Sequence, residues 1–320
     1  MGGGRVHEFR FSAAMPRLTG SVARWRDDLR RIEDLGFWAV AVSDHFTRGW
    51  VMEPVVAMTV AAEATTDLRV QSLVLGNDYR HPVLLHKAMA TLDVMSGGRV
   101  EIGLGAGWMP SDYAAANLPL DPPGVRVDRL AEAIEVVTGL FGPGPLTYAG
   151  KHYRITDLDG LPKPVQGPRP PVLIGGGGRR VLQLAGEAAD IVGINPSMRP
   201  SRPAGQGLLD LTGDRVAAKL AIAREAARAA GRDPDTLRYQ TSVLALTVTD
   251  APGSGSWVSS LAADVRDPAV LASSPAVLRG SIAECVDTLV RRREELGLDY
   301  FHFGGDPLAA APIVARLAGA

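Results

Sequence analysis

A carboxylate and an imidazole stand side by side where an apolar run of the sequence ends. Residues 39–42 (Ala-Val-Ala-Val) are followed directly by Ser43, Asp44 and His45. Small and β-branched residues in such a run are typical of a strand buried on both faces. Asp44 and His45 would then lie at the carboxyl end of a strand, where α/β barrels and doubly wound sheets hold their active sites. The alternative is that Asp44 caps the next turn and His45 is an ordinary loop histidine.

A second candidate site is a run of four glycines, residues 175–178, followed by Arg179 and Arg180. The run lies between a short apolar segment and a helical pattern. Free N–H groups at a helix start, a backbone that a ligand can approach and adjacent cations together favour phosphate binding. No Gly-Lys-Ser/Thr follows, so the run is not a Walker motif. The alternative is a flexible turn with two solvated arginines.

Other reactive residue types form no known catalytic spacing. A metal site needs three or four ligands, and no paired spacing relates the remaining histidines, which are His7, His81, His86, His152 and His302. No Gly-x-Ser-x-Gly follows a predicted strand, which argues against a serine nucleophile. Cys285 is the only cysteine and falls in a helical pattern, as small buried side chains often do. We therefore expect neither a metal nor a nucleophilic cysteine.

Charge and hydropathy exclude several classes of protein. Lys plus Arg is 34 and Asp plus Glu is 35, a formal net charge of −1, which is not the electrostatic footprint of a nucleic-acid-binding protein. No run of 18 apolar residues occurs, so we expect no membrane span. The N-terminus lacks the apolar segment of a secretory signal, and a single cysteine suits the reducing cytoplasm. We expect a cytoplasmic protein.

The elements that must position these residues alternate between strand and helix. The patterns predict strands over residues 8–14, 38–42, 69–75, 99–104, 171–174, 189–194, 237–247 and 299–303. They predict helices over residues 22–35, 53–64, 83–95, 125–141, 179–186, 214–230, 281–296 and 307–317. Alternation of this kind implies parallel pairing of the strands.

Eight such units in 320 residues fit a (β/α)8 TIM barrel, read as one domain over residues 1–320. Insertions follow strands 4, 6 and 7, at residues 109–124, 195–213 and 249–279, and residues 142–171 form a further irregular excursion. A doubly wound sheet is the competing fold. It usually carries Gly-x-Gly-x-x-Gly after its first strand, where this chain has Ala-Ala-Met-Pro at residues 13–16. The barrel is the better prediction.

Several segments in this order carry a family resemblance. They include residues 33–37 (Glu-Asp-Leu-Gly-Phe), 43–46 (Ser-Asp-His-Phe), 92–100 (Leu-Asp-Val-Met-Ser-Gly-Gly-Arg-Val), 103–108 (Gly-Leu-Gly-Ala-Gly-Trp) and 171–177 (Pro-Val-Leu-Ile-Gly-Gly-Gly). Through them the chain resembles the bacterial-luciferase-like superfamily of flavin and deazaflavin oxidoreductases, in particular its actinobacterial F420-dependent branch. The resemblance covers nearly the whole sequence. It implies a (β/α)8 barrel, a homodimer, a flavin-type ring in the barrel mouth and a small organic substrate.

The resemblance also implies roles for individual residues. Asp44 would hydrogen-bond the ring or its ribityl chain, and His45 would act as the acid–base or substrate-anchoring group. A cis non-proline peptide within residues 72–74 would back the ring. The implied cofactor-binding residues beside Asp44 are therefore Ser72, Leu73 and Val74 for the ring, with Ala106, Gly107, Gly175, Gly176, Gly177, Gly178 and Arg179 for the linker and phosphate.

One position departs from the family pattern. The sugar-phosphate dehydrogenases of this branch carry a catalytic glutamate where this chain has Trp108. Asp112 could replace that acid only if the following loop turns back. Glucose-6-phosphate oxidation is therefore not expected, and Trp50 and Trp108 would suit a less polar substrate. Alternatively both tryptophans are wall or lid residues.

The leading prediction is an enzyme that transfers a hydride between coenzyme F420 and a C=C, C=N or C=O group of a small organic substrate. The alternative is an FMN-dependent monooxygenase of the same fold that uses O2. No motif in the sequence separates these two cofactors. A third possibility, a non-catalytic relative, is disfavoured by the intact Asp44–His45 pair and glycine run.

Overall fold

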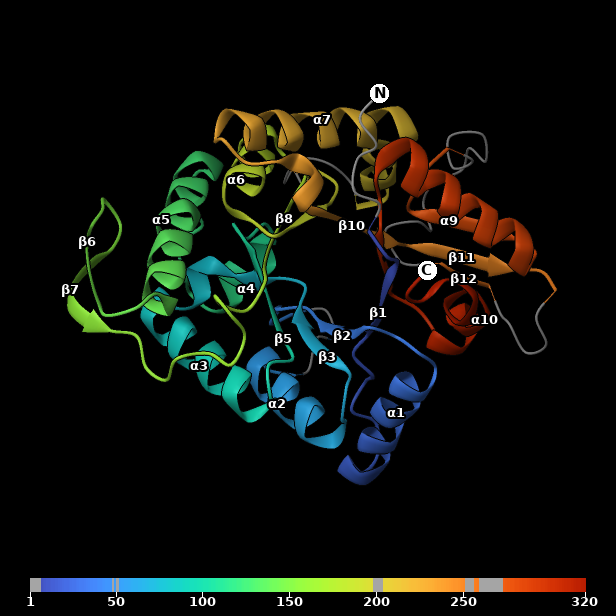
Figure 1. The fold of residues 1–320 in the computed structure, drawn as a ribbon, viewed down its shortest axis with the longest axis horizontal. Coiled ribbons are helices and arrows are strands. Elements are labelled where there is room, and N and C mark those ends of the chain that lie inside the picture. The colour runs from blue at the N-terminus through green and yellow to red at the C-terminus, as the bar shows by residue number, and fades with distance from the viewer. Residues whose placement is uncertain (1–6, 48, 50–51, 198–203, 251–255, 259–272) are drawn as a thin grey trace.

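A computed structural model describes residues 7–47, 49, 52–197, 204–250, 256–258 and 273–320. Within these residues eight parallel strands close into a barrel surrounded by helices (Figure 1). In order around the barrel they are β1 (Arg10–Ala14), β2 (Ala39–Val42), β3 (Arg69–Ser72), β5 (Val100–Gly105), β8 (Val172–Gly176), β9 (Ile191–Ile194), β10 (Arg238–Val243) and β14 (Tyr300–Phe303). The predicted (β/α)8 barrel is confirmed.

The helices that follow the strands also lie where the sequence patterns predict them, within about two residues at each end. They are α1 (Val22–Asp34), α2 (Pro54–Ala64), α3 (Pro82–Met95), α5 (Pro123–Phe141), α6 (Arg179–Ala188), α7 (Gly213–Ala229), α9 (Ile282–Leu296) and α10 (Pro307–Leu317). Local signals explain this agreement. Ser281 and Glu284 form a capping box at the start of α9, and Gly36 takes a positive φ of 81° after α1.

Two predicted strands are divided in the structure. The third strand, expected over residues 69–75, breaks after Ser72 at a cis peptide between Leu73 and Val74, and resumes as β4 (Leu75–Gly76). The seventh strand, expected over residues 237–247, leaves the barrel after Val243. Its second part, β11 (Ala245–Val248), instead pairs with β12 (Ser256–Val258) and β13 (Val277–Gly280) in a separate sheet. The residues at the two breaks, Leu73, Val74 and Leu244, are apolar like ordinary strand residues, so composition alone did not show the breaks.

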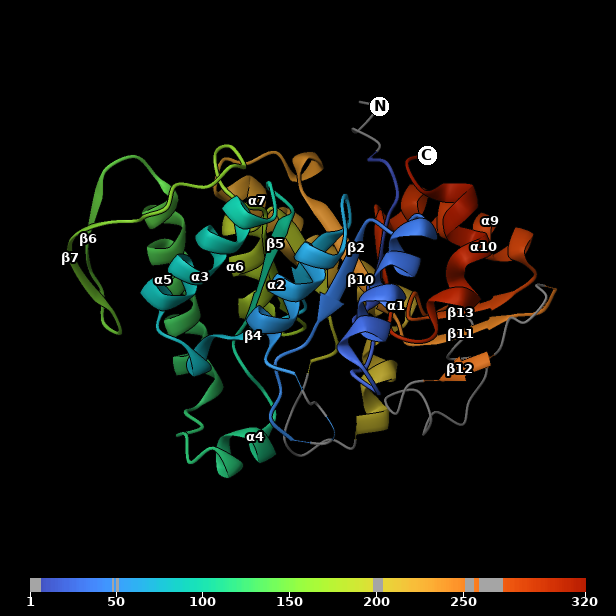
Figure 2. The ribbon, with the colours of Figure 1, turned by 90° about the horizontal axis from the view of Figure 1, so that it is seen from below.

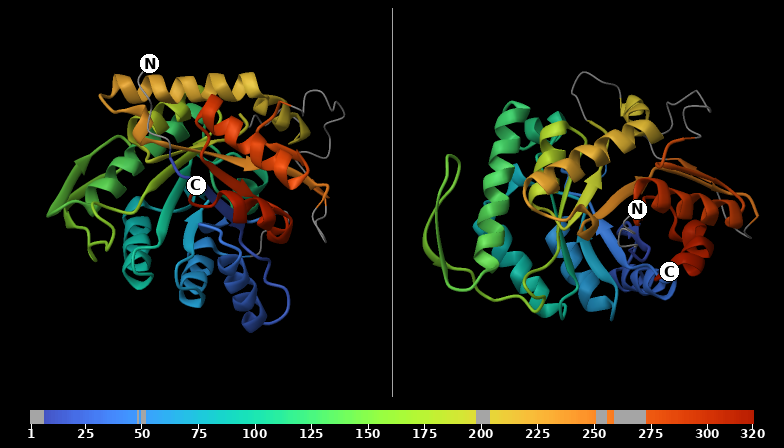
Figure 3. Two further views of the ribbon diagram at one scale, coloured as in Figure 1. Left: turned by 45° about the vertical axis from the view of Figure 1, so that its right-hand side comes forward. Right: turned by 45° about the horizontal axis from the view of Figure 1, so that its top comes forward.

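The insertions contain short elements of their own. α4 (Pro110–Ala115) follows β5 and lies at the end of the barrel in Figure 2. Residues 142–171, expected to be irregular, contain an antiparallel hairpin of β6 (Pro145–Ala149) and β7 (Arg154–Asp159), which stands apart from the barrel in both views of Figure 3. The short 3-10 helix η2 (Ala204–Leu211) follows β9. Among the described helices none is long and apolar enough to cross a membrane.

The barrel has an apolar outer core and a polar floor. Side chains such as Phe11, Phe301 and Leu29 pack between strands and helices and are fully buried. Inside the barrel, near the amino ends of the strands, the buried carboxylate of Glu101 accepts hydrogen bonds from the Trp38 indole (2.8 Å) and from other polar side chains, Gln71 (2.7 Å) and Tyr300 (3.0 Å). Such a buried charge needs these donors, so the floor is closed and the opposite end forms the mouth.

Candidate active site

His45 and Asp112 form a hydrogen-bonded pair at the mouth of the barrel. His45 follows β2, and α4 turns the chain back so that Asp112 Oδ2 lies 2.6 Å from His45 Nδ1. The other oxygen, Oδ1, accepts hydrogen bonds from the Thr47 hydroxyl (2.6 Å) and the Thr47 amide (3.0 Å). The loop therefore does turn back, which is the condition under which Asp112 could replace the acid missing at Trp108.

Asp112 is an ionised carboxylate in this arrangement although it is fully buried. Burial by itself would raise the pKa of Asp112, but hydrogen bonds from Thr47 and His45 outweigh burial and lower that pKa below its usual value. A carboxylate on Nδ1 holds the imidazole in the tautomer with the proton on Nδ1 and fixes the orientation of the ring. The buried Asp112 carboxylate therefore fixes the orientation of the His45 ring.

The two tryptophans are placed differently. Trp108 is partly buried and lies edge-on to the His45 ring, with 5.8 Å between ring centroids. It forms part of the wall beside His45. Trp50 lies outside the described residues, so its role in the substrate site stays a prediction.

The Asp44 carboxylate makes an ion pair and a hydrogen bond within the protein. The residue is 3% exposed, and its carboxylate pairs with the Arg80 guanidinium and accepts a hydrogen bond from the Gly76 amide (3.0 Å). Arg80 also pairs with Glu53 at 2.6 Å. Asp44 therefore ties the end of β2 to β4. A contact between Asp44 and the cofactor stays a prediction.

The segment around the cis peptide is held from both sides. The Leu73 carbonyl accepts a hydrogen bond from the Ser43 hydroxyl (3.1 Å), and the Leu73 amide donates to the Val42 carbonyl (2.7 Å). The Ser72 hydroxyl donates to the Gly103 carbonyl (3.0 Å) and accepts from the Gly103 amide (2.8 Å). The cis bond lies within residues 72–74, where the resemblance places it. Leu73 and Val74 remain partly exposed at the mouth.

Several glycines of the mouth are explained by packing inside the protein. A Cβ built at Gly105 would lie 2.7 Å from the Val74 side chain, and one built at Gly175 would lie 3.0 Å from it. At Gly107, which has φ 73°, a Cβ would lie 2.0 Å from the Tyr113 hydroxyl. These glycines let neighbouring segments approach each other. Around Gly178, by contrast, a Cβ would meet nothing within 4 Å, so the space in front of α6 is open.

Buried cations hold the carbonyl groups of both glycine loops. On α7, Lys219 donates to the Gly177 carbonyl (2.7 Å) and pairs with Asp210 (2.9 Å). On α5, Arg126 donates to the Ala106 carbonyl (3.2 Å) and the Gly107 carbonyl. Lys219 and Arg126 are each 6% exposed. The cations draw these carbonyl oxygens toward the helices.

Three backbone N–H groups in the same two glycine loops have no hydrogen-bond acceptor among the described residues. In the described part of the chain, the N–H groups of Gly107, Gly178 and Arg179 donate no hydrogen bond, and α6 has no side-chain cap. Arg179 is exposed and makes no ion pair among the described residues, whereas Arg180 pairs with Asp128. Unpaired amides at a helix start with a nearby cation have the properties of an anion site.

Three of these residues were not found from the sequence. Arg80, Arg126 and Lys219 act through contacts with segments far away in the chain. A signal existed for Lys219, because it stands on the apolar face of its helix with Val216 and Leu220. A cation in such a position needs a buried partner.

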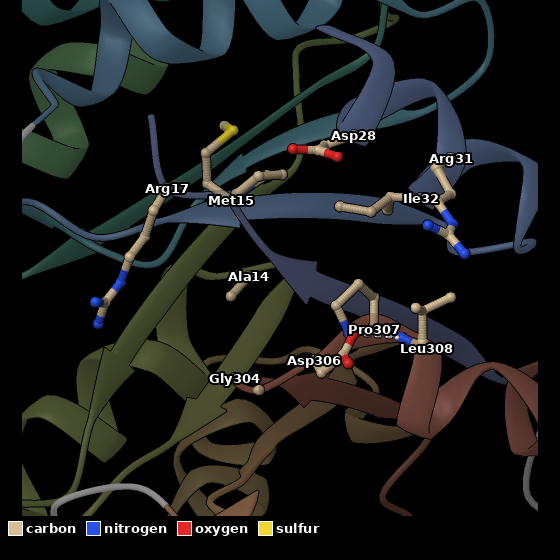
Figure 4. Close-up of a pocket in the computed structure, with 12 residues that line it drawn as sticks. Ala14, Met15, Arg17, Asp28, Arg31, Ile32, Gly304, Asp306, Pro307 and Leu308 are labelled. Carbon is tan, nitrogen blue, oxygen red and sulfur yellow. Dashed lines mark hydrogen bonds between the residues drawn. The ribbon is translucent and has the colours of Figure 1, made fainter. Parts of the chain in front are cut away.

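A cavity of about 390 Å³ lies at the carboxyl ends of β1 and β14, between these strands and the helices α1 and α10 (Figure 4). Ala14 and Gly304 line it from the strand ends, Ile32 from α1 and Leu308 from α10. Among the described residues no group of three or more His, Cys, Asp or Glu side chains could hold a metal ion. Cys285 is buried, and burial raises the pKa of its thiol to about 11.

The model of the luciferase-like monooxygenase family matches residues 7–251. The chain belongs to this family. Its structural relatives have the same barrel: an F420-dependent secondary alcohol dehydrogenase, solved with an F420–acetone adduct, superposes with a TM-score of 0.76 at 18% identity, covering 97% of this chain and 98% of that one.

Curated members of the luciferase-like family match parts of the chain. An F420-dependent glucose-6-phosphate dehydrogenase from Amycolatopsis mediterranei is 30% identical over 50% of this chain and 49% of its own length. An FMNH2-dependent dimethylsulfone monooxygenase from Pseudomonas putida is 28% identical over 49% of this chain and 44% of its own. The chain thus spans about half the length of the curated relatives it matches, and these relatives use two different cofactors.

Proposed function

We propose that this luciferase-like protein is an oxidoreductase that transfers a hydride between coenzyme F420 and a small organic substrate with a C=C, C=N or C=O group. The observation that carries the proposal is the His45–Asp112 pair. It orients an acid–base group two residues after Ser43, whose hydroxyl donates to the Leu73 carbonyl at the cis peptide, in a barrel of this family. When bound, the cofactor supplies the hydride or accepts it.

The residues present fit a cofactor that carries a phosphate. The amides of Gly107, Gly178 and Arg179 are unpaired among the described residues, and the Arg179 side chain adds a positive charge. Lys219 and Arg126 hold the neighbouring carbonyls away from that anion. The remaining implied residues, Gly175, Gly176 and Gly177, shape the loop. Leu73 and Val74 offer an apolar surface for a flat ring.

His45 would exchange the proton that accompanies the hydride. With Nδ1 donating to Asp112, the lone pair of neutral imidazole lies on Nε2, which can accept a proton from a hydroxyl group. In the opposite direction the imidazolium returns that proton. The Asp112 carboxylate stabilises the imidazolium, as in other carboxylate–histidine pairs.

The alternative function is an FMN-dependent monooxygenase that uses O2. It is supported by the Pseudomonas putida relative and by the apolar Trp108 wall beside His45. The same loops would hold the FMN phosphate. Residues of the mouth do not separate the two cofactors.

A direct titration tests the proposal. Purified protein is titrated with F420 and, separately, with FMN, and binding is followed by cofactor fluorescence. Saturable F420 binding that is tighter than FMN binding supports the proposal. Tight FMN binding without F420 binding would establish the alternative, and binding of neither would exclude both.

A cytoplasmic homodimer is also proposed. Exposed aliphatic side chains near the starts of neighbouring helices, Val56 on α2 (63% exposed) and Leu84 on α3 (68%), offer an apolar surface that such an interface could cover. Light scattering coupled to size exclusion tests the dimer, with a mass near 34 kDa arguing against it.

A further inference from the structure

A second histidine, His302 on β14, points into the barrel. Its strand neighbours Phe301 and Phe303 are fully buried in the outer core. Because side chains alternate along a strand, His302 faces the opposite way, toward the interior. The register places it level with Ser12 on β1 and Ser242 on β10. No step of the proposed function uses it.

Ser12 determines which nitrogen of His302 carries the proton. The Ser12 hydroxyl lies 3.0 Å from His302 Nδ1 and is fully buried. This hydroxyl has no other hydrogen-bond partner among the described residues. If it accepted from Nδ1, its own buried hydrogen would stay unpaired, so donation to Nδ1 is the favoured arrangement. In the neutral ring Nε2 then carries the hydrogen. Burial lowers the pKa of His302 to about 4, which keeps the ring neutral near pH 7.

The Nε2 side of His302 is open to the mouth. Nε2 makes no hydrogen bond to the described residues, and the side chain keeps partial exposure, unlike its neighbours on the strand. The next interior-facing residues along the two strands are Ala14 and Gly304, which are small. No larger side chain therefore follows His302 on the inner face of β1 or β14.

Other polar groups lie at the same level and below. Ser242 faces the interior beside His302 and is partly exposed. One level deeper, Gln240 donates to Gln71 (3.0 Å), while its own Oε1 is buried without a partner among the described residues. This half of the mouth is polar, in contrast to the Leu73–Val74 half. A substrate with one polar end and one apolar end matches the two halves.

We propose that His302 donates its Nε2 hydrogen to an oxygen atom of the substrate. The substrates would then be compounds that offer an oxygen acceptor, such as carbonyl or hydroxyl compounds, rather than simple alkenes. The proposal rests on the proposed function, because it names a contact within the same mouth. His302 reaches this space from β14 and His45 from the end of β2, with β1 between them.

Three variants and one control test the proposal. His302→Leu removes the donor at similar volume, His302→Gln keeps an N–H donor near the position of Nε2, and Ser12→Ala frees the tautomer. His7→Gln, outside the barrel, is the control. The probes are cyclohexanol with F420, cyclohexanone with reduced F420, and methylcyclohexane, a competitive inhibitor of similar size that has no hydrogen-bond acceptor.

We expect His302→Leu to raise KM for the two oxygen-bearing probes about tenfold, the effect of one lost hydrogen bond to a substrate. The Ki of methylcyclohexane and the Kd of F420 should stay within about twofold. His302→Gln should recover most of the loss in KM, and the KM of Ser12→Ala should lie between those of wild type and His302→Leu. An equal change for all three probes, no change for any of them, or no recovery in His302→Gln would overturn the proposal.

A second measurement separates this proposal from the proposed function. Nitrogen-15 NMR of histidine-labelled protein follows the His302 Nε2 resonance as cyclohexanone is added. The His302 resonance is identified as the one that His302→Gln lacks, and its shift on addition of cyclohexanone supports the contact even if no probe turns over. An unmoved resonance overturns it. Failure of wild-type protein to bind F420 or FMN counts against the proposed function alone.

Discussion

Asp112 Oδ2 lies 2.6 Å from His45 Nδ1, although the two residues are 67 positions apart in the chain. The contact joins the end of β2 to the short helix α4 that follows β5. The family relatives with a catalytic glutamate carry it at the position of Trp108, which has no carboxylate in this chain. The contact supplies His45 with a buried carboxylate from Asp112 instead. Several predictions depend on this contact and on the loops around it.

Replacing Asp112 with Asn should reduce turnover sharply while the fold is retained. An amide can keep a hydrogen bond but cannot stabilise the imidazolium, so we expect kcat to fall by about 100-fold or more. Steady-state kinetics with F420 and cyclohexanol measure the loss. Asp128→Asn, which alters the exposed pair with Arg180, is the control and should keep wild-type turnover. An Asp112→Asn enzyme with full kcat would show that His45 does not depend on this carboxylate.

The stability of the protein should depend on the ionisation of Asp112 in acid. Its pKa is lower in the folded protein than in the unfolded chain, where it is about 3.9. The carboxylate therefore contributes stability above the unfolded pKa and loses that contribution as pH falls through the folded pKa. Urea unfolding of wild type and Asp112→Asn between pH 3 and 6 measures the difference in free energy of unfolding. The difference should be full near pH 6 and shrink toward pH 3, and a constant difference would contradict the assignment.

Lys219→Met should weaken binding of the phosphate end of the cofactor. Without the ammonium group the Gly177 carbonyl loses its donor, and the loop can present that oxygen to the anion. We expect about tenfold weaker binding of FMN, with riboflavin, which lacks the phosphate, affected less than twofold. Fluorescence titration gives both constants. Lys163→Met, at the exposed pair with Asp159, should change neither, and equal losses for both ligands would mean a general loosening of the site.

Gly103→Ala should destabilise the protein while Gly178→Ala should not. A Cβ at Gly103 would lie 1.9 Å from the Ser72 carbonyl oxygen, a backbone atom that cannot move aside, whereas Gly178 has open space around it. We expect a loss of about 3 kcal/mol for Gly103→Ala from overpacking and less than about 0.5 kcal/mol for Gly178→Ala. Chemical unfolding compares the two variants. Similar stabilities would contradict the packing described for β3 and β5.

Features that depend on neighbours in the chain were predictable from the sequence. The apolar runs, helical periodicity and caps such as Ser281 with Glu284 are local, and they placed the eight strands and their helices. For the same reason the sequence placed Asp44 and His45 correctly, at the carboxyl end of the second strand. The divided strands were not predictable, because residues 73–74 and 244 are apolar and carry no local signal of a break.

The chemistry of the site was decided by the tertiary structure. The sequence by itself determined the barrel, its family and the position of His45 at the mouth. Only the folded chain decided that Asp112 supports His45, that Asp44 is paired with Arg80, and that Lys219 and Arg126 hold the glycine loops. The physical reason is that these contacts join segments distant in sequence, and their geometry is set by how closely the strands pack, as Gly103 does against Ser72. No local pattern encodes such a distance.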